Sequence, residues 1–369
     1  MKRLCSIVLL CVGLAACSPL ASPTPAQQGE TNRIQLVKET QLTEEGREIR
    51  SWSPDGSRLL VLKQNAGTGL ENVPIAIVNL EDDSIAKISH PGVGAIWSPD
   101  SAALVIESIG EHGKRERWLF SLQENQATRL DGIAGGPIAW LAGGRLVYDT
   151  EDGLWSVKLD LPKGSATSSP LAVSEPTHVL SYAHAGGRRW SFPSPQLTSI
   201  MLYDGTNDQV HKWWLVQPNG DWIRVDKLLY SLGTCCAWSP DGSRFAFLGF
   251  EPGTGPDSSA YSGPGLYVVD ANGENLKRIL TAQDVGAGTF ISMSFSPDGQ
   301  TIAFEWSRHE EGFPFGNTQI YVVNVDGSGL RNLTPNSAPH RWLRWSPNGK
   351  YIAFEQNDSV WVAEVTNRQ

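Results

Sequence analysis

The sequence predicts an all-β protein: one seven-bladed β-propeller of four-stranded antiparallel blades, with the ring closed by the N-terminal strand joining the last blade. Three observations lead to this fold. A short turn motif recurs along the chain, its copies start 43 to 57 residues apart, and β-rich runs flank each copy. Five copies read Trp/Phe-Ser-Pro-Asp-Gly or differ from it at one position, and they start at Trp52, Trp97, Trp238, Phe295 and Trp345. Two degenerate copies start at Trp140 and Pro193.

Each copy of the motif joins two strands of one blade. Its proline fixes φ and its glycine accepts a positive φ, as a tight turn requires. After the turn come a β-rich run and a third strand, such as 319–324. A second turn, such as Asp326-Gly327, then leads to a fourth strand that ends near Thr334. Four antiparallel strands at this period are typical of a propeller blade.

The two ends of the chain are expected to share a blade. The last copy stops after its third strand, at 359–365, and a spare strand at 34–43 precedes the first copy. The spare strand ends in Leu-Thr, as fourth strands elsewhere in the chain do. Its pairing with the last blade would remove the two exposed edges that a linear array leaves.

The repeats resemble those of the TolB-like, WD40-like (PD40) β-propeller repeat family. The resemblance covers about residues 33–369, with five good turn matches and poor ones at 140 and 193. The chain departs from TolB itself, which has six blades and an additional N-terminal α/β domain. The resemblance therefore does not imply a role in the Tol–Pal envelope system.

The N-terminus predicts a lipid anchor. Lys2 and Arg3 precede an apolar run at 4–14, which is too short to span a bilayer and typical of a signal peptide. The following Leu-Ala-Ala-Cys17 closely resembles a bacterial lipobox, which implies cleavage before Cys17 and lipidation of that cysteine. A plain secretory peptide, cut at an A-x-A-like site, is the alternative. We expect a signal peptide at 1–16, a lipidated cysteine and disordered Pro/Ser/Ala tether at 17–32, and one propeller domain at 33–369.

The predicted cellular location and the charge of the chain define the expected partners. A bacterial lipoprotein would sit in the cell envelope, anchored to the extracytoplasmic side of a membrane. The net charge is −9, and losing residues 1–16, which carry Lys2 and Arg3 but no acid, gives −11. Nucleic-acid binding needs concentrated Lys and Arg, so we expect no nucleic-acid partner. We expect a monomeric body that binds a protein or a glycan.

The binding face should be the one opposite the motif turns, where the loops after second and fourth strands lie. Long loops on a rigid scaffold are the usual place for binding. The loop expected at 305–318 is the richest in aromatic and charged side chains, and the alternative is a solvated loop that covers a blade top. The candidate binding residues are Trp306, Arg308, His309, Glu310, His340, Arg341, Trp342 and Cys235.

Acids at the ends of second strands suggest a second kind of site. They occupy matched positions in the repeats, at Glu107, Asp149, Asp204, Glu305 and Glu355. A ring of such acids near the axis could bind a cation or a sugar. We favour the interpretation that the repeat copies an acid that stays hydrated or caps a neighbouring loop.

No catalytic residues are predicted, and no metal or cofactor. The chain lacks the nucleophile elbow G-x-S-x-G and the close histidine spacing of a metal motif. The sequence therefore favours a binding module over an enzyme. The alternative is a polysaccharide lyase-like or hydrolase-like enzyme with a metal or acid/base site at the axis. Convergence of three or more loop-face histidines on the axis would favour that alternative, and their scatter would disfavour it; the set is His90, His178, His184, His309 and His340.

Two adjacent cysteines lie on the innermost strand of the fifth blade. Cys236 aligns with apolar residues of the other blades and should pack between blades, whereas Cys235 aligns with a mixed set and could face the channel. Adjacent α-carbons lie about 3.8 Å apart, below the usual disulfide span of about 4.4–6.8 Å. A disulfide between them would need a distorted peptide.

Overall fold

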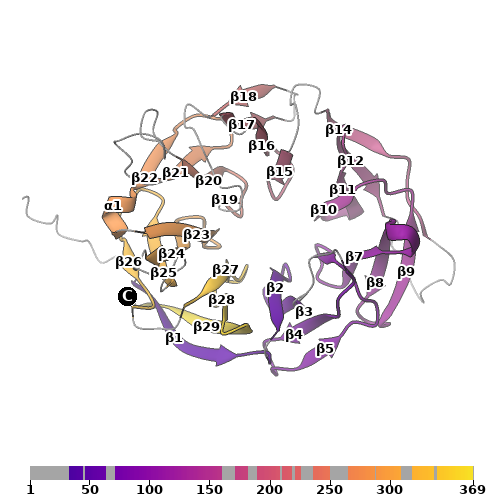
Figure 1. The fold of residues 1–369 in the computed structure, drawn as a ribbon, viewed down its shortest axis with the longest axis horizontal. Coiled ribbons are helices and arrows are strands. Elements are labelled where there is room, and N and C mark those ends of the chain that lie inside the picture. Colours follow the sequence, from indigo (N-terminus) through magenta and orange to yellow (C-terminus); the bar gives the residue numbers. More distant parts are fainter. Residues whose placement is uncertain are drawn as a thin grey trace, which may run out of the picture.

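The predicted seven-bladed all-β propeller is confirmed. In the computed structural model, seven sheets follow one another around a central axis (Figure 1). The structure describes residues 33–368 apart from 45, 64–70, 160–170, 182–188, 208–209, 218–220, 226–235, 250–264, 287, 309–317 and 336–338. Helix in this part of the chain is confined to α1 (Ala282–Val285) and two 3-10 turns, Glu111–Gly113 and Ala142–Gly144.

The first three blades carry the features used below. Blade 1 contains β2 (Arg47–Trp52), β3 (Arg58–Lys63), β4 (Ile75–Asn79) and β5 (Ile85–Lys87). Blade 2 contains β6 (Gly94–Trp97), β7 (Ala103–Ile109), β8 (Arg115–Ser121) and β9 (Gln126–Asp131). Blade 3 contains β10 (Gly136–Leu141), β11 (Arg145–Asp149), β12 (Gly153–Lys158) and β14 (Thr177–Ser181). The short β13 (Leu171–Ala172) pairs in parallel with β9, so the chain between β12 and β14 adds a fifth strand to blade 2.

The remaining four blades repeat the same order. Blade 4 contains β15 (Arg189–Pro193), β16 (Ile200–Asn207), β17 (Val210–Val216) and β18 (Trp222–Arg224). Blade 5 contains β19 (Cys236–Trp238), β20 (Arg244–Gly249), β21 (Gly265–Asp270) and β22 (Lys277–Leu280). Blade 6 contains β23 (Gly288–Phe295), β24 (Thr301–Arg308), β25 (Thr318–Asn324) and β26 (Arg331–Asn332). Blade 7 contains β27 (Arg341–Trp345), β28 (Tyr351–Gln356), β29 (Ser359–Arg368) and β1 (Arg33–Gln41).

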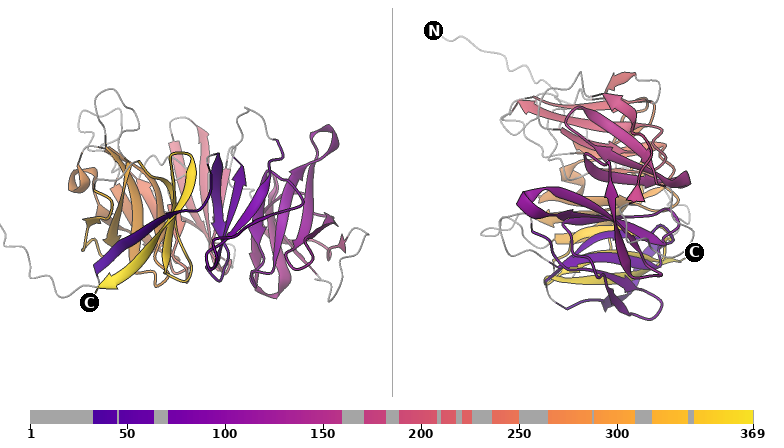
Figure 2. Two further views of the ribbon diagram at one scale, coloured as in Figure 1. Left: turned by 90° about the horizontal axis from the view of Figure 1, so that it is seen from below. Right: turned by 90° about the vertical axis from the view of Figure 1, so that its right-hand side faces the viewer.

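Blade 7 closes the ring as the sequence predicts. β1 pairs antiparallel with β29, with Leu36 opposite Val365 and Gln41 opposite Trp361. Figure 2 shows the N-terminal strand, in indigo, running along the yellow C-terminal strand. Just beyond β1, the backbone N–H of Leu42 donates to the carbonyl of Val360 at 2.8 Å. The fourth strand of this blade thus comes from the opposite end of the chain.

The serine of the turn motif has a structural role. In the first copy, the backbone N–H of Arg58 donates to Ser53 Oγ at 2.9 Å, and this hydroxyl donates to Asp55 Oδ1 at 2.6 Å. Ser57 Oγ also donates to Asp55, at 2.8 Å, from the exposed side of the turn. The motif serines of five other blades accept a backbone N–H in the same way: Ser98, Ser194, Ser239, Ser296 and Ser346. In every blade except blade 3, where Leu141 replaces it, the motif serine therefore bonds the start of the second strand.

The glycine of the motif meets the neighbouring turn. Gly56 has φ +71°, and a Cβ there would lie 2.8 Å from the backbone nitrogen of Asn348. Asn348 Nδ2 donates to the Gly56 carbonyl at 2.8 Å, so the turns of blades 7 and 1 are joined directly. Both the backbone conformation and the close approach require glycine at this position.

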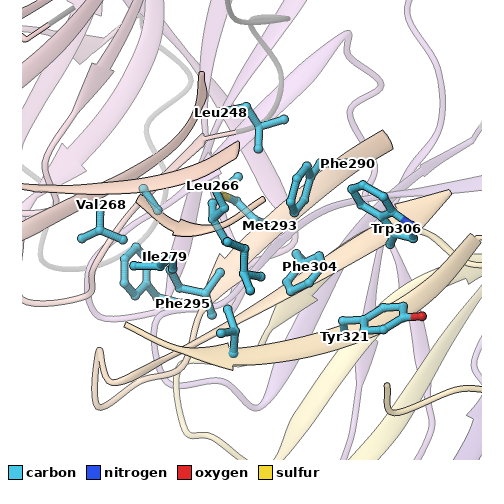
Figure 3. Packing of buried hydrophobic residues seen from close by; sticks show 14 of the residues in the cluster. Leu248, Leu266, Val268, Ile279, Phe290, Met293, Phe295, Phe304, Trp306 and Tyr321 are labelled. Atoms are coloured by element: carbon cyan, nitrogen blue, oxygen red, sulfur yellow. The ribbon is translucent and has the colours of Figure 1, made fainter. Parts of the chain in front are cut away.

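The hydrophobic core lies between the blades. Figure 3 shows the cluster that joins blades 5 and 6, in which Leu266 of one blade packs with Phe290, Phe304 and Trp306 of the next. Phe290 and Trp306 meet edge to face, with ring centroids 4.7 Å apart. Each sheet therefore buries its apolar faces against its neighbours in the ring.

Within the described ranges, no helix is long and apolar enough to cross a membrane.

Replacing Ser53 by alanine should lower the free energy of unfolding by about 1–3 kcal/mol, because a buried backbone N–H loses its acceptor. The matched control is Ser57→Ala, which removes a hydroxyl on the exposed side of the same turn and should cost less than about 0.5 kcal/mol. Chemical denaturation of the two variants measures both values. Equal losses would contradict the role assigned to the motif serine.

Candidate functional site

A hollow lies between blades 2 and 3, on the face opposite the motif turns. β7 and β11 both run away from their motif turns, so Glu107, near the end of β7, and Asp149, at the end of β11, lie on this loop face. A cavity of about 1070 Å³ opens here, and a second of about 630 Å³ extends it toward blade 1. The two cavities share the lining residues Arg115, Gly136 and Asp149, and Glu107 lines the second. We call this continuous hollow the blade 2–3 groove; its other main lining residues are Arg117, Gly135, Tyr148, Thr150, Glu151, Asp152, Trp155 and Pro176.

Two arginines form the blade 2 wall of the groove. Arg115 and Arg117 are two residues apart on β8 and therefore project to the same face of the sheet. Arg115 bonds Glu107 through Nη1, and Arg117 Nη2 lies 3.6 Å from the other oxygen of the same carboxylate. The side chain of Arg115 is 46% exposed and that of Arg117 only 6%. Two guanidinium groups share one carboxylate, so this wall carries a net positive charge.

The guanidinium of Arg117 makes some, but not all, of its possible hydrogen bonds. Its Nη1 donates to the carbonyls of Arg115 at 3.1 Å and Ile133 at 3.4 Å, whereas its buried Nε has no hydrogen-bond partner within the described part of the chain. Burial lowers the pKa of Arg117, and the charge of Arg115 lowers it further. A guanidinium nevertheless stays protonated in proteins, so a buried positive charge faces the groove.

The opposite wall is acidic and belongs to blade 3. Asp149, Glu151 and Asp152 follow one another at the turn between β11 and β12. Asp152 accepts hydrogen bonds from Thr150 Oγ1 and from the indole nitrogen of Trp155, the latter at 3.3 Å. The hydrogen bond from Thr150 is the largest cause that lowers the pKa of Asp152. The groove therefore has a basic wall and an acidic wall.

Aromatic side chains line the blade 3 side of the groove. Tyr148 pairs with Trp155 across β11 and β12, and Trp155 pairs with His178 across β12 and β14. The three rings therefore share one face of the sheet. Trp155 is half-buried, and its ring centroid lies 4.8 Å from that of His178 in an edge-on contact. Trp155 can offer an apolar surface beside the charged walls.

Two of the second-strand acids join consecutive blades. Glu305 of β24 accepts the backbone N–H of Leu343 in β27 at 2.8 Å and the hydroxyl of Ser292 at 2.7 Å. Glu355 of β28 accepts the backbone N–H of Ile49 in β2 at 2.8 Å. At the matched position of blade 2, the described bonds of Glu107 go to arginines instead. The carboxylate that ties blades together elsewhere holds the basic wall of the groove here.

The remaining two second-strand acids are Asp149 and Asp204. Asp149 lines the groove, and the side chain of Asp204 lies outside the described residues. Within the described chain, no group of three or more His, Cys, Asp or Glu side chains could hold a metal ion.

Burial raises the pKa of both inter-blade acids. The pKa of the fully buried Glu305 rises to about 7, although its hydrogen bonds and Arg344 act in the opposite direction. The pKa of Glu355 also rises to about 7, chiefly through burial, with smaller contributions from Glu48 and Glu305. These carboxyls ionise near neutral pH rather than near the ordinary glutamate value of 4.5.

The candidate binding residues of blades 6 and 7 are spread between core and surface. Trp306 is fully buried in the inter-blade core, because β24 extends to Arg308 where the sequence analysis expected a loop from 305. Arg308 is exposed, with Nη2 3.3 Å from the hydroxyl of Tyr321. His309, Glu310 and Cys235 lie outside the described residues, as does Cys17.

The other three candidates lie at the start of the innermost strand of blade 7. Arg341 and Trp342 are exposed, and Trp342 adopts φ +60°, which is unusual for a bulky side chain. His340 is fully buried and meets Phe354 edge-on, with ring centroids 4.5 Å apart. Burial lowers the pKa of His340 to about 4, so the imidazole is neutral at physiological pH.

The three described loop-face histidines contact separate aromatic rings. His90 lies 4.3 Å from Trp118, measured between ring centroids, His178 contacts Trp155, and His340 contacts Phe354. These contacts belong to different blades, so the three histidines do not converge. His184 and His309 lie outside the described residues.

Cys236 lies in the interface between blades 4 and 5, among residues such as Phe192 and Phe245. It is a free thiol, and burial raises its pKa well above the usual range. A thiol of this kind is unreactive, because the thiolate is the nucleophile.

Arg115, Arg117, Asp152 and Trp155 line the groove but are not among the candidate residues predicted from the sequence. A usable signal was the Arg-Glu-Arg run at 115–117, which places two cations on one face of a strand shortly after the second-strand acid Glu107. The acids at 149–152 lie in the next repeat, so only the ring arrangement shows that the two sets face each other.

Comparison with known proteins supports the fold. No family model matches the chain. An uncharacterised protein of Agrobacterium fabrum is 28% identical over 122 residues, which is 33% of this chain and 35% of that protein. Dipeptidyl-peptidase 5 of Porphyromonas gingivalis is 32% identical over 66 residues, which is 18% of this chain and 10% of that protein. The chain thus matches about a third, or less, of the length of these curated relatives.

Solved structures align over most of the chain. An oligogalacturonate lyase in complex with manganese aligns with a TM-score of 0.58 and 15% identity, covering 92% of this chain and 96% of the lyase. The Cps50 (Swd1) β-propeller domain of Myceliophteria thermophila aligns with a TM-score of 0.55 and 12% identity, covering 90% of this chain and 100% of that domain. TolB from Acinetobacter baumannii aligns with a TM-score of 0.45 and 15% identity over 78% of this chain and 66% of TolB, too weakly to carry an argument. At these identities the alignments establish a β-propeller fold and nothing about activity.

A change at Glu305 should alter how stability depends on pH. The folded state holds its proton up to about pH 7, whereas the unfolded state releases it near 4.5, so ionisation lowers the stability of the wild type as pH rises between these values. Glu305→Gln keeps an acceptor for Leu343 without ionising. The variant should therefore lose less stability between pH 5 and pH 8 than the wild type, as measured by urea unfolding.

The control for this experiment is Glu364→Gln, an exposed acid of blade 7 whose Oε1 lies 3.5 Å from Lys38 Nζ. It should leave the slope of stability against pH unchanged. Glu355 keeps its own contribution, so Glu305→Gln flattens the slope only in part. Identical slopes for wild type and Glu305→Gln would contradict the raised pKa.

Proposed function

We propose that this propeller is a binding module that takes a partner protein or a glycan in the blade 2–3 groove of its loop face. The observation that supports the proposal is the groove itself, a continuous hollow with two charged walls and an aromatic surface. Its charged and aromatic residues come mostly from β7, β8, β11 and β12 and from the tight turn between β11 and β12. Such a site is positioned before a ligand arrives, which reduces the ordering cost of binding.

The second part of the proposal is the anchor. The lipobox-like run before Cys17 and the Pro/Ser/Ala-rich segment after it support a propeller tethered to the extracytoplasmic side of a bacterial membrane. The net charge of −9 supports partners other than nucleic acid. A monomeric body on such a tether could reach ligands near the membrane surface.

The enzyme alternative requires a cluster of loop-face histidines. The three that the structure describes contact separate aromatic rings, and a cluster would have to draw on His184 and His309. A binding module requires only the groove, so we propose binding.

Reversing the charge of Arg115 should abolish capture of the partner. The full chain, in mild detergent, is immobilised and exposed to envelope extract and to a glycan panel. Arg115→Glu places an acid on the basic wall and should reduce retained ligand at least tenfold. Arg129→Glu is the matched control, because Arg129 lies in the same blade, is 42% exposed and is ion-paired, but does not line the groove. Equal capture by the wild type and Arg115→Glu would contradict the proposed site.

Cys17→Ser should release the protein from the membrane fraction, because the residue that receives the lipid is lost. Fractionation followed by immunoblotting measures the distribution of the chain. Cys236→Ser is the control, since this buried thiol has no part in anchoring, and it should remain with the membranes. Retention of Cys17→Ser in the membrane fraction would refute the lipid anchor.

A further inference from the structure

We infer that the blade 2–3 groove binds a short peptide segment that carries its own carboxylate at one end and a basic group toward the other. The inference rests on the proposed binding function and narrows it to one ligand class. Its basis is the opposition of a buried, incompletely bonded arginine on one wall and carboxylates on the other.

The basic wall is arranged to receive a carboxylate. Arg117 is 6% exposed, and its Nε has no hydrogen-bond partner among the residues that the structure describes. Arg115 beside it is 46% exposed and can turn toward a ligand without leaving Glu107 uncompensated, because Arg117 remains close to that acid. Guanidinium groups bind carboxylates through charge-assisted and often paired hydrogen bonds. A ligand carboxylate would balance the positive charge that Glu107 alone leaves.

The acidic wall determines what the rest of the ligand carries. Asp152 lies in the same groove and keeps its negative charge, since hydrogen bonds lower its pKa. A polyanion that reached the arginines would be repelled by this wall, and a neutral sugar would gain no charge attraction from either wall. A segment with a carboxylate and an amino or guanidinium group satisfies both walls at once.

The dimensions and the aromatic surface fit a peptide. The larger cavity, at about 1070 Å³, is at the upper end of the range for small-molecule sites, and a further 630 Å³ adjoins it. An extended peptide advances about 3.3 Å per residue, so several residues can cross such a hollow. The half-buried ring of Trp155 offers a contact for an apolar side chain between the two charged ends.

The test compares three pools of random tetrapeptides by equilibrium dialysis against the full chain in mild detergent. The first pool has free carboxylates and one lysine per peptide. The second is identical but amidated at the C-terminus. The third keeps the carboxylate but has norleucine for lysine and an acetylated N-terminus. Mass spectrometry measures how much of each pool is retained, and the first pool should exceed each of the others about tenfold.

Variants assign each end of the peptide to its wall. Arg115→Gln should lower retention of the first pool about tenfold and leave the amidated pool unchanged, because that pool has no carboxylate to lose. Asp152→Asn, which keeps a hydrogen-bond acceptor, should lower the first pool and leave the third unchanged. Arg129→Gln, outside the groove, should change none of them. This pattern is a specific coupling that a merely destabilised fold does not produce.

The other outcomes decide between the peptide inference and the proposed binding function. Retention of the amidated pool within twofold of the first overturns the inference, as does equal loss with Arg115→Gln and Arg129→Gln. If no pool binds but the glycan panel or envelope extract still gives capture sensitive to Arg115→Glu, the peptide inference is wrong and the proposed binding function stands. If nothing binds in any format, both are wrong.

Discussion

The structure depends on one constraint: each blade must bury its apolar faces against its neighbours. The clusters of buried side chains lie between blades, as where Phe290 and Trp306 of blade 6 pack against blade 5. Each interface therefore supports the next, and the last blade must meet the first. Pairing of β1 with β29 meets that requirement and leaves no interface open.

A repeated fold allows one position to take different roles. At the end of the second strand, the acid of blades 6 and 7 accepts a backbone N–H from the following blade and adds a polar bond to the apolar interface. In blade 2 the equivalent acid, Glu107, bonds two arginines instead. The innermost strand of the following blade contains Pro137, which has no N–H to donate. At this one position, the acid bonds arginines on the groove wall instead of a backbone N–H of the next blade.

The fold was predictable because its signals are local. The proline, glycine and serine of the motif act within five residues of one another, as the bond between Arg58 and Ser53 shows. The groove was not, because its walls come from separate blades. Trp306 illustrates a related difficulty: it followed the expected end of a strand, but β24 continues to Arg308, so the two-residue period of the strand places Trp306 with Phe304 in the core.

The energetics of Arg117 distinguish a structural role from a binding role. A charge that is nearly all buried, with a nitrogen left unbonded, lowers the stability of the folded state, and an apolar side chain would pack between the blades at lower cost. The six other inter-blade interfaces and the closed ring allow the fold to tolerate this loss. A stabilising role therefore does not explain a buried guanidinium beside an open groove. Under the proposed function, a ligand carboxylate that bonds this guanidinium would recover, in the complex, the free energy lost in the unbound protein.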